Sequence, residues 1–356
     1  DVDQLSVTTH AESFNTAAAG GLVGANDYSS VKVENVNAQN LSVSGKNLRD
    51  LGGLLAAVRG STNFEVNNCN LKSTQITLSG AKNKEAYTGG IIGYHNNKLN
   101  ISNVTLEEQS AINGQQYTGG FIGKSEGNIE ISYCREDKVN IKTDLNWIGG
   151  FIGHLKSGVK AVIKNCQEND VNIFGRYVGG LVGATDGNIQ ASNVEFNRVM
   201  AVINKKDSPY CAGLITGNAN NTGNANNTVS GYNILANSCK TGYNFKTIVE
   251  NLPTADLTEV STSGFWIGKS VRTTTINLTA VAAKGQVFPK KDIGTNNGSA
   301  TIIYADAFVD QTYQPINSTD KPSSSASPWL DVNPKSDVPF ADGTIMTGNG
   351  VGMQEG

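Results

Sequence analysis

Strands with one apolar and one polar face recur along the first two thirds of the chain. Apolar and polar residues alternate in VKVENV from Val31, FEVNNC from Phe64, LNISNV from Leu99 and IEISYC from Ile129. Because side chains alternate between the two faces of a strand, this pattern is typical of strands with one face in a core and the other in water.

A glycine-rich apolar motif precedes each of these strands. Its clearest copies are GGLVG (20–24), GGIIG (89–93), GGFIG (119–123 and 149–153) and GGLVG (179–183), and weaker copies begin at Asp50 and Tyr210. Another short strand follows each alternating strand, as in VNI from Val139 and VNI from Val171. Three strands repeated every roughly 30 residues are typical of a solenoid, in which each strand pairs with its equivalent in the next turn.

The sequence therefore predicts an all-β fold, a right-handed parallel β-helix of about seven three-strand rungs. We expect residues 1–17 to form an N-terminal cap and residues 18–247 the β-helix. Seven of the eight prolines lie at or beyond Pro253, so we expect residues 248–356 to form an irregular β-rich cap and an extended tail, with GFWIG from Gly264 as a degenerate last rung. Caps are expected because the end rungs of a solenoid are unpaired edges.

An asparagine ends the alternating strand in nearly every repeat. The column consists of Asn35, Asn68, Asn103, Asn165 and Asn193, and Tyr133 interrupts it. Continued alternation places these side chains on the inward face, where an amide is costly unless it is hydrogen-bonded. We therefore predict a buried ladder in which stacked amides bond to one another along the solenoid axis.

Large side chains flank the glycine motif. If the motif is one continuous strand, its outward face carries an aromatic stripe made of Tyr87, Tyr117, Trp147, Tyr177 and Tyr210, with Phe121 and Phe151 beside it. Such an apolar patch is unusual on a monomer. Either the C-terminal region covers the stripe, or it is a docking face for sugar rings or a second subunit. If the opposite parity holds, the tyrosines stack inside.

Acidic residues cluster in the turn after the asparagine column. Glu107, Asp137 and Glu168 would lie along one edge of the stack, where carboxylates can bind Ca²⁺ or act as an acid–base pair on sugars. We prefer the simpler interpretation, a solvated turn with neutralising cations. HExxH and CxxC are absent, and no column mixes Asp, Lys and Arg into a catalytic wall. We therefore assign no catalytic residue, no metal ligand and no cofactor, apart from the Ca²⁺ alternative.

Composition narrows the function classes further. Charged residues make up 17% of the chain and the formal net charge is −3, which does not resemble the basic footprint of a nucleic-acid-binding protein. No apolar run approaches the roughly 20 residues of a membrane-spanning helix. Cys69, Cys134 and Cys166 occupy positions where other repeats have valine, which favours small buried side chains; Cys211 and Cys239 are candidates for a disulfide in a secreted protein.

The five clear copies of the glycine motif resemble the GLUG-repeat family of secreted and cell-surface bacterial proteins, over residues 18 to about 217. The resemblance implies a surface or extracellular location and no particular activity. GLUG repeats occur in adhesin-like proteins and beside the catalytic part of some IgA-cleaving metallopeptidases, whose zinc motif is missing here.

Two functions remain as hypotheses. The first is a non-catalytic extracellular structural or adhesive protein, whose rod presents the aromatic stripe for self-assembly into filaments, for contact with other surface proteins or for glycan attachment. The alternative is a polysaccharide lyase or glycoside hydrolase of the β-helix type. Three or more Asp, Glu, Lys or Arg side chains converging in one groove would favour the enzyme.

Overall fold

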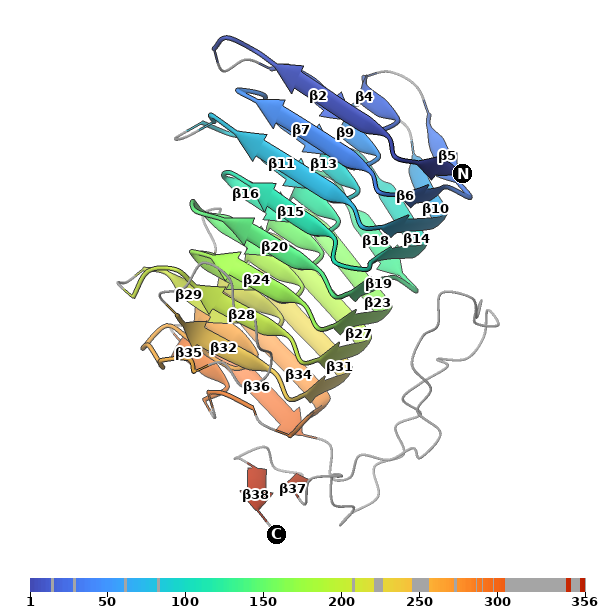
Figure 1. Ribbon diagram of the computed structural model, residues 1–356. Helices are drawn as coiled ribbons and strands as arrows, with labels where there is room; N and C mark the ends of the chain where they lie inside the picture. The colour runs from blue at the N-terminus through green and yellow to red at the C-terminus, as the bar shows by residue number, and fades with distance from the viewer. Residues whose placement is uncertain are drawn as a thin grey trace.

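The computed structural model is an all-β parallel β-solenoid of about six turns, drawn from blue to orange in Figure 1. It describes residues 1–304 except 14–15, 28–29, 61–62, 82–83, 207–208, 221–226, 245–255, 272–273, 286, 290 and 297, and in addition 344–346 and 353–355. The predicted fold class is confirmed, whereas the right-handed winding stays a prediction. The part of the chain that the structure describes contains no candidate membrane-spanning helix.

Four sheets run along the solenoid, numbered here in the order in which the chain passes through them in each turn. Sheet I contains β3 (Ala18–Gly20), β8 (Asp50–Gly52), β12 (Tyr87–Gly89), β16 (Tyr117–Gly119), β21 (Trp147–Gly149), β25 (Tyr177–Gly179) and β29 (Cys211–Gly213). Sheet II contains β4 (Val23–Asn26), β9 (Leu55–Val58), β13 (Ile92–His95), β17 (Ile122–Ser125), β22 (Ile152–Leu155), β26 (Val182–Thr185), β30 (Thr216–Ala219), β33 (Ile267–Ser270) and β35 (Ile293–Asn296).

The other two sheets complete each turn. Sheet III contains β1 (Val2–Asp3), β5 (Lys32–Glu34), β6 (Asn37–Gln39), β10 (Phe64–Lys72), β14 (Leu99–Glu107), β18 (Ile129–Ser132), β19 (Arg135–Asp137), β23 (Lys160–Asn169), β27 (Asn188–Asn197), β31 (Thr228–Asn237), β34 (Thr275–Lys284) and β36 (Ser299–Tyr304). Sheet IV contains β2 (Ser6–His10), β7 (Ser42–Lys46), β11 (Gln75–Ser79), β15 (Ala111–Gly114), β20 (Asn140–Thr143), β24 (Asn172–Gly175), β28 (Met200–Ile203) and β32 (Lys240–Tyr243). A separate antiparallel pair joins β37 (Thr344–Met346) to β38 (Met353–Glu355).

The solenoid extends beyond the predicted boundary at residue 247. Strands β33 and β35 continue sheet II, and β34 and β36 continue sheet III, all in parallel. At the other end, β1 and β2 pair in parallel with β6 and β7. The described parts of the two predicted caps therefore add strands to the same sheets. The tail from 305 to 343 lies outside the described residues.

The glycine motif is a corner between two sheets, so each turn has four strands and not the three predicted. In the repeat from Tyr87, β12 ends at Gly89 and β13 begins at Ile92. A Cβ atom on Gly93 would lie 2.5 Å from the carbonyl oxygen of Ala56 and 2.7 Å from that of Leu51. Because sheets I and II approach each other backbone to backbone here, glycine is the residue that fits.

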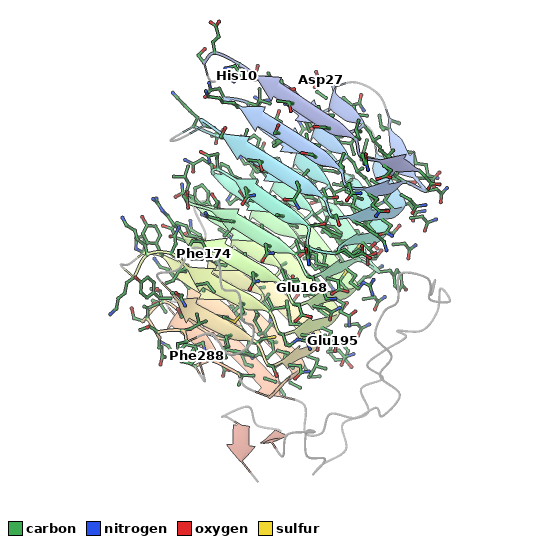
Figure 2. All side chains as sticks on the ribbon, in the orientation of Figure 1. His10, Asp27, Glu168, Phe174, Glu195 and Phe288 are labelled. Carbon is green, nitrogen blue, oxygen red and sulfur yellow. The ribbon has the colours of Figure 1, made fainter. Side chains whose placement is uncertain are left out.

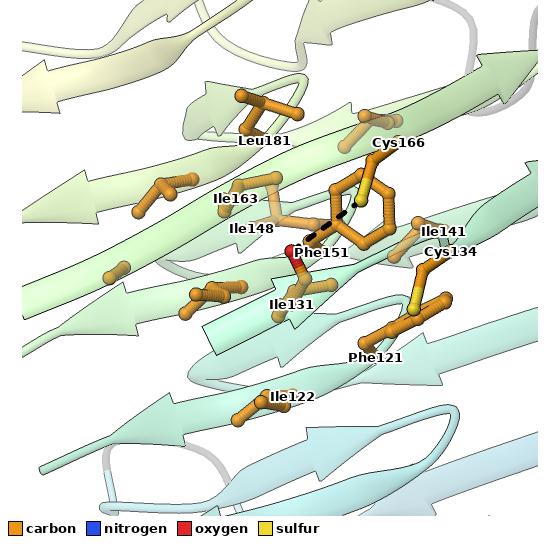
Figure 3. Close-up of a cluster of buried hydrophobic side chains, with 14 of the residues drawn as sticks. Phe121, Ile122, Ile131, Cys134, Ile141, Ile148, Phe151, Ile163, Cys166 and Leu181 are labelled. Atoms are coloured by element: carbon orange, nitrogen blue, oxygen red, sulfur yellow. Dashed lines mark hydrogen bonds between the residues drawn. The ribbon is translucent and has the colours of Figure 1, made fainter. Parts of the chain in front are cut away.

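The corner corrects the predicted orientation of Phe121 and Phe151. Strand alternation does not continue through a bend, and both rings point into the core, where they are fully buried (Figure 3). Their centroids lie 4.8 Å apart at an interplanar angle of 81°, an edge-to-face packing that aromatic rings favour. Neither ring belongs to the outward stripe.

The asparagine column adopts a conformation that the pattern did not predict. Its members and the residues aligned with them have φ between 51° and 60°. This left-handed conformation, which asparagine tolerates better than most residues, bends the strands of sheet III. After the bend the following residue faces inward, so Cys69, Cys134 and Cys166 are buried among apolar side chains, as predicted. All five cysteines are free, Cys211 and Cys239 included.

The amide ladder forms only in part. The Nδ2 of Asn193 donates to Oδ1 of Asn165 at 2.8 Å, and the Nδ2 of Asn68 donates to Oδ1 of Asn35 at 3.3 Å. Asn103 instead donates to Oδ1 of Asn67, which lies on the neighbouring strand position. Of the predicted column only Asn165 is buried, Asn35 is exposed, and Asn68, Asn103 and Asn193 are half-buried, because the bend turns the side chains out of the core.

We expect Asn165→Leu to lower the free energy of unfolding by about 1–3 kcal/mol, because it removes an amide acceptor and places a branched side chain at positive φ. Asn165→Gly is the matched variant, since it relieves the backbone strain but also loses the amide. Urea titration of both variants separates the two causes. Equal stability of the wild type and Asn165→Leu would show that the amide ladder does not stabilise the fold.

Candidate functional site: an aromatic ladder and a charged pocket

Parallel pairing in register stacks the outward aromatic residues of sheet I directly above one another. Tyr87 pairs with Tyr117, Tyr117 with Trp147, and Trp147 with Tyr177. The successive ring centroids are 5.2, 4.7 and 6.0 Å apart. The predicted outward stripe thus exists for these four residues as a continuous ladder along the solenoid.

Tyr210 joins the ladder from a different position. Tyr177 pairs with Cys211, so the last repeat is shifted by one residue relative to the motif alignment. Even so, the Tyr210 ring lies 5.5 Å from that of Tyr177, and the guanidinium carbon of Arg176 lies 5.3 Å from the Tyr210 ring centroid. The ladder therefore ends in a cation–π contact.

Side chains of sheet II cover the first half of the ladder. Tyr87 and Tyr117 are 4% and 8% exposed. Tyr94 stacks on Tyr87 at 5.1 Å, and the Nζ of Lys124 lies 5.1 Å from the Tyr87 ring centroid and 5.0 Å from that of Tyr117. Burial raises the pKa of all three tyrosines. Cover for these rings thus comes from within the solenoid. The far C-terminal region, one of the two predicted covers, lies almost entirely outside the described residues.

The second half of the ladder remains half-exposed, at Trp147, Tyr177 and Tyr210. His154 packs against the Trp147 ring at 5.3 Å and its Nε2 lies 3.1 Å from Oδ2 of Asp186. Because Trp147 stacks between Tyr117 and Tyr177, both of its ring faces have aromatic neighbours, and it offers mainly ring edges to solvent. This geometry suits a ladder that stabilises the rod more than an open platform for flat ligands.

A pocket of about 600 Å³ opens at the N-terminal end of the ladder. Its lining consists of Thr16, Asp27, Arg49, Arg59, Glu85, Tyr87, Tyr94 and Glu126. Asp27 marks this end of the solenoid at the top of Figure 2. The volume lies within the range of pockets that bind small molecules.

Asp50 anchors the pocket from behind. It occupies the motif position that Tyr87 holds in the next turn, and its side chain is fully buried. Arg49 lies 3.1 Å from its carboxylate, and Arg59 is also paired with it. Burial raises the pKa of Asp50 in spite of the opposing effect of the two arginines. The arginines are thereby fixed at the pocket wall by a buried partner.

Glu126 occupies the other side of the pocket. Lys124 and Lys156 lie 2.8 and 2.7 Å from its carboxylate oxygens. Although burial opposes ionisation, these two bonds outweigh it and lower the pKa of Glu126 to about 2. Glu126 is therefore a carboxylate at neutral pH and cannot act as a proton donor there.

The sequence analysis found no column that mixes Asp, Lys and Arg, yet residues from different columns form a charged cluster at this pocket. The pocket is lined by Arg49, Arg59, Glu85 and Glu126 from successive turns, and these residues are paired with Asp50 and Lys124. They belong to different columns of the repeat, so a search for one mixed column missed them. One signal was available, because Asp50 replaces an aromatic residue at the first position of the motif.

The acidic turn residues do not form the Ca²⁺ site considered above. Glu107 pairs with Asp137 on the outer face, whereas Glu168 pairs with Glu136, and both of these side chains are fully buried in the core. Adjacent residues of a strand point to opposite faces, so Glu168 cannot share a ligand with Glu107 and Asp137. Within the described ranges, no group of three or more His, Cys, Asp or Glu side chains is arranged to hold a metal ion.

Comparisons with known proteins leave the chain without a family. No family model, curated protein or solved structure matches it. The sequence resemblance to GLUG repeats therefore has no support from these comparisons, whereas the parallel β-solenoid itself is shown by the structure.

Proposed function

We propose that this protein is a non-catalytic structural or adhesive protein that acts at the cell surface or outside the cell. The solenoid is the rigid rod, and the ladder face with its pocket is the surface for attachment or self-assembly. The observation that supports this proposal most directly is that the charged side chains of the pocket are held in ion pairs, as they are in a recognition surface. The resemblance to GLUG repeats supports the location.

The protonation states of the acids support a non-catalytic role. Glycoside hydrolysis generally needs one carboxyl group that stays protonated near neutral pH beside one that is ionised. At the pocket, Glu126 has a lowered pKa, and Asp50, whose pKa is raised by burial, lies fully buried behind the wall and is paired with two arginines, out of reach of a polysaccharide. The carboxyls with the most strongly raised pKa, Glu136 and Glu168, lie fully buried in the core, out of reach of a polysaccharide.

The test is a panel of neutral and acidic polysaccharides incubated with the purified protein. We expect neither new reducing ends nor unsaturated products. Product release that disappears in Glu126→Gln, but persists in Glu130→Gln on sheet III, would overturn the proposal.

A polysaccharide lyase or hydrolase is the second candidate, and the pocket itself favours it. Asp27, Arg49, Arg59, Glu85 and Glu126 converge there, which is the arrangement that we expected to distinguish an enzyme. The same panel decides between the candidates, with Glu85→Gln and Asp27→Asn as further variants.

Self-assembly is tested by deleting residues 320–356 and examining both proteins by electron microscopy and light scattering. If the tail joins neighbouring molecules, the full chain forms filaments and the truncated chain gives isolated rods with unchanged circular dichroism. Identical behaviour of the two proteins would exclude the tail from assembly.

A further inference from the structure

We propose that the pocket formed by Arg49, Arg59, Glu85, Tyr94 and Glu126 is a binding site for a neutral saccharide. This inference rests on the attachment role proposed above and names the ligand class of its surface. It follows from the charge balance, the density of hydrogen-bonding groups and the side chains that occupy the Tyr94 position in other turns of sheet II.

The pocket and its ion-pair partners are electrically balanced. Four carboxylates, Asp27, Asp50, Glu85 and Glu126, are paired with four cations, Arg49, Arg59, Lys124 and Lys156. A charged ligand would have to displace one member of a pair and leave its partner uncompensated. A neutral ligand avoids this cost.

The rim nevertheless offers many hydrogen-bonding groups. The Glu85 side chain is 64% exposed, and Asp27 is 47% exposed. Sugar hydroxyls both donate and accept, so they can donate to these carboxylates and accept from the guanidinium groups of Arg49 and Arg59. An apolar ligand would displace water from these groups without replacing its hydrogen bonds.

Tyr94 supplies the apolar part of the pocket. It is half-exposed, stacks on Tyr87 and lies beneath the guanidinium of Arg59, whose Cζ is 5.7 Å from the ring centroid. The aligned residues in other turns are Ala57, Lys124, His154 and Ala184. Since alanine occupies this position in the adjacent turn, the ring is not required by the coil itself, and its removal is expected to leave the fold intact.

The experiment is isothermal titration with two matched probes, a panel of neutral β-linked oligosaccharides and a panel of oligogalacturonides. We expect at least one neutral oligosaccharide to bind, and Glu85→Ala and Tyr94→Ala each to raise its Kd by about tenfold or more. Glu130→Ala is the control, because Glu130 is a half-exposed glutamate paired with Lys164 on sheet III. Circular dichroism establishes that each variant is folded.

Several results would overturn the inference. Binding of the oligogalacturonides alone would show that the charge-balance argument is wrong, and unchanged affinity in both pocket variants would place the site elsewhere. Absence of saccharide binding, with assembly or surface attachment intact, would reject the ligand class and leave the proposed function standing. Binding followed by cleavage would reject the non-catalytic function and keep the saccharide site.

Discussion

Replacing both Glu136 and Glu168 with leucine is expected to stabilise the protein at neutral and alkaline pH. The two carboxyls are register partners in the core, fully buried, and neither has a hydrogen-bond partner among the described residues. The column continues with Leu106 on one side and Phe196 on the other. Leu106 packs against Gly90 as Glu136 packs against Gly120, so leucine fits the same space. We expect a gain of about 1–4 kcal/mol for the double replacement.

The stabilisation should depend on pH. Burial raises the pKa of Glu136 to about 8, and burial, Glu136 and Cys166 together raise that of Glu168. At pH values above the ordinary carboxyl pKa near 4.5, the folded protein therefore binds more protons than the unfolded chain. The contribution of the two protonated carboxyls to the free energy of unfolding is complete below that pH and is lost as the pH rises toward 8.

Urea titrations at intervals from pH 5 to pH 9 provide the measurement. Relative to the double leucine variant, the wild type should lose stability steadily across this range, and Glu130→Leu on the outer face should follow the wild type. A wild type that keeps or gains stability relative to the double variant as the pH rises would show that the buried pair is compensated.

Gly153→Ala is expected to cause the second large effect, a loss of about 3 kcal/mol or more. The added Cβ would lie 2.5 Å from the carbonyl oxygen of Gly123 and 2.7 Å from the backbone nitrogen of Thr118. These are backbone atoms of two neighbouring strands, so no rotamer change relieves the overlap. Sheets I and II would have to separate at the corner.

Gly24→Ala is the matched control for this variant. Gly24 aligns with Gly153 along sheet II but lies in the first turn, where the nearest atom to an added Cβ is the carbonyl oxygen of Ala18 at an ordinary 3.5 Å. We expect a change within about 1 kcal/mol. Thermal unfolding of both variants tests the corner; similar losses, or none in either, would refute the backbone-contact explanation for the motif.

The solenoid was predictable because a shift of one residue in strand register would expose every inward side chain of that strand. The apolar pattern therefore specifies the register strongly. The repeat spacing and the clean alternation in segments such as LNISNV fixed the pairing of β10 with β14. The corner was harder, since GGFIG reads equally well as a continuous strand. Only the contacts of glycines such as Gly93 with two other strands show that the chain turns there.

The site was less predictable than the fold. The aromatic ladder followed directly from in-register stacking, but its cover by Tyr94 and Lys124 depends on the angle between sheets I and II, which the pattern does not encode. The pocket brings together residues from unequal connections, such as Asp27 and Glu85. The burial of Glu136 depends on the left-handed residue Tyr133, which reverses the parity of the strand.

The most direct test of a non-catalytic attachment surface is saturation-transfer NMR of neutral oligosaccharides mixed with the intact protein and followed for a day. We predict saturation transfer to sugar protons that weakens in Glu85→Ala and persists in Glu130→Ala, with no new anomeric signals. New anomeric or unsaturated-sugar signals that vanish in Glu85→Ala would contradict it, and so would the absence of transfer from every oligosaccharide together with the absence of any assembly.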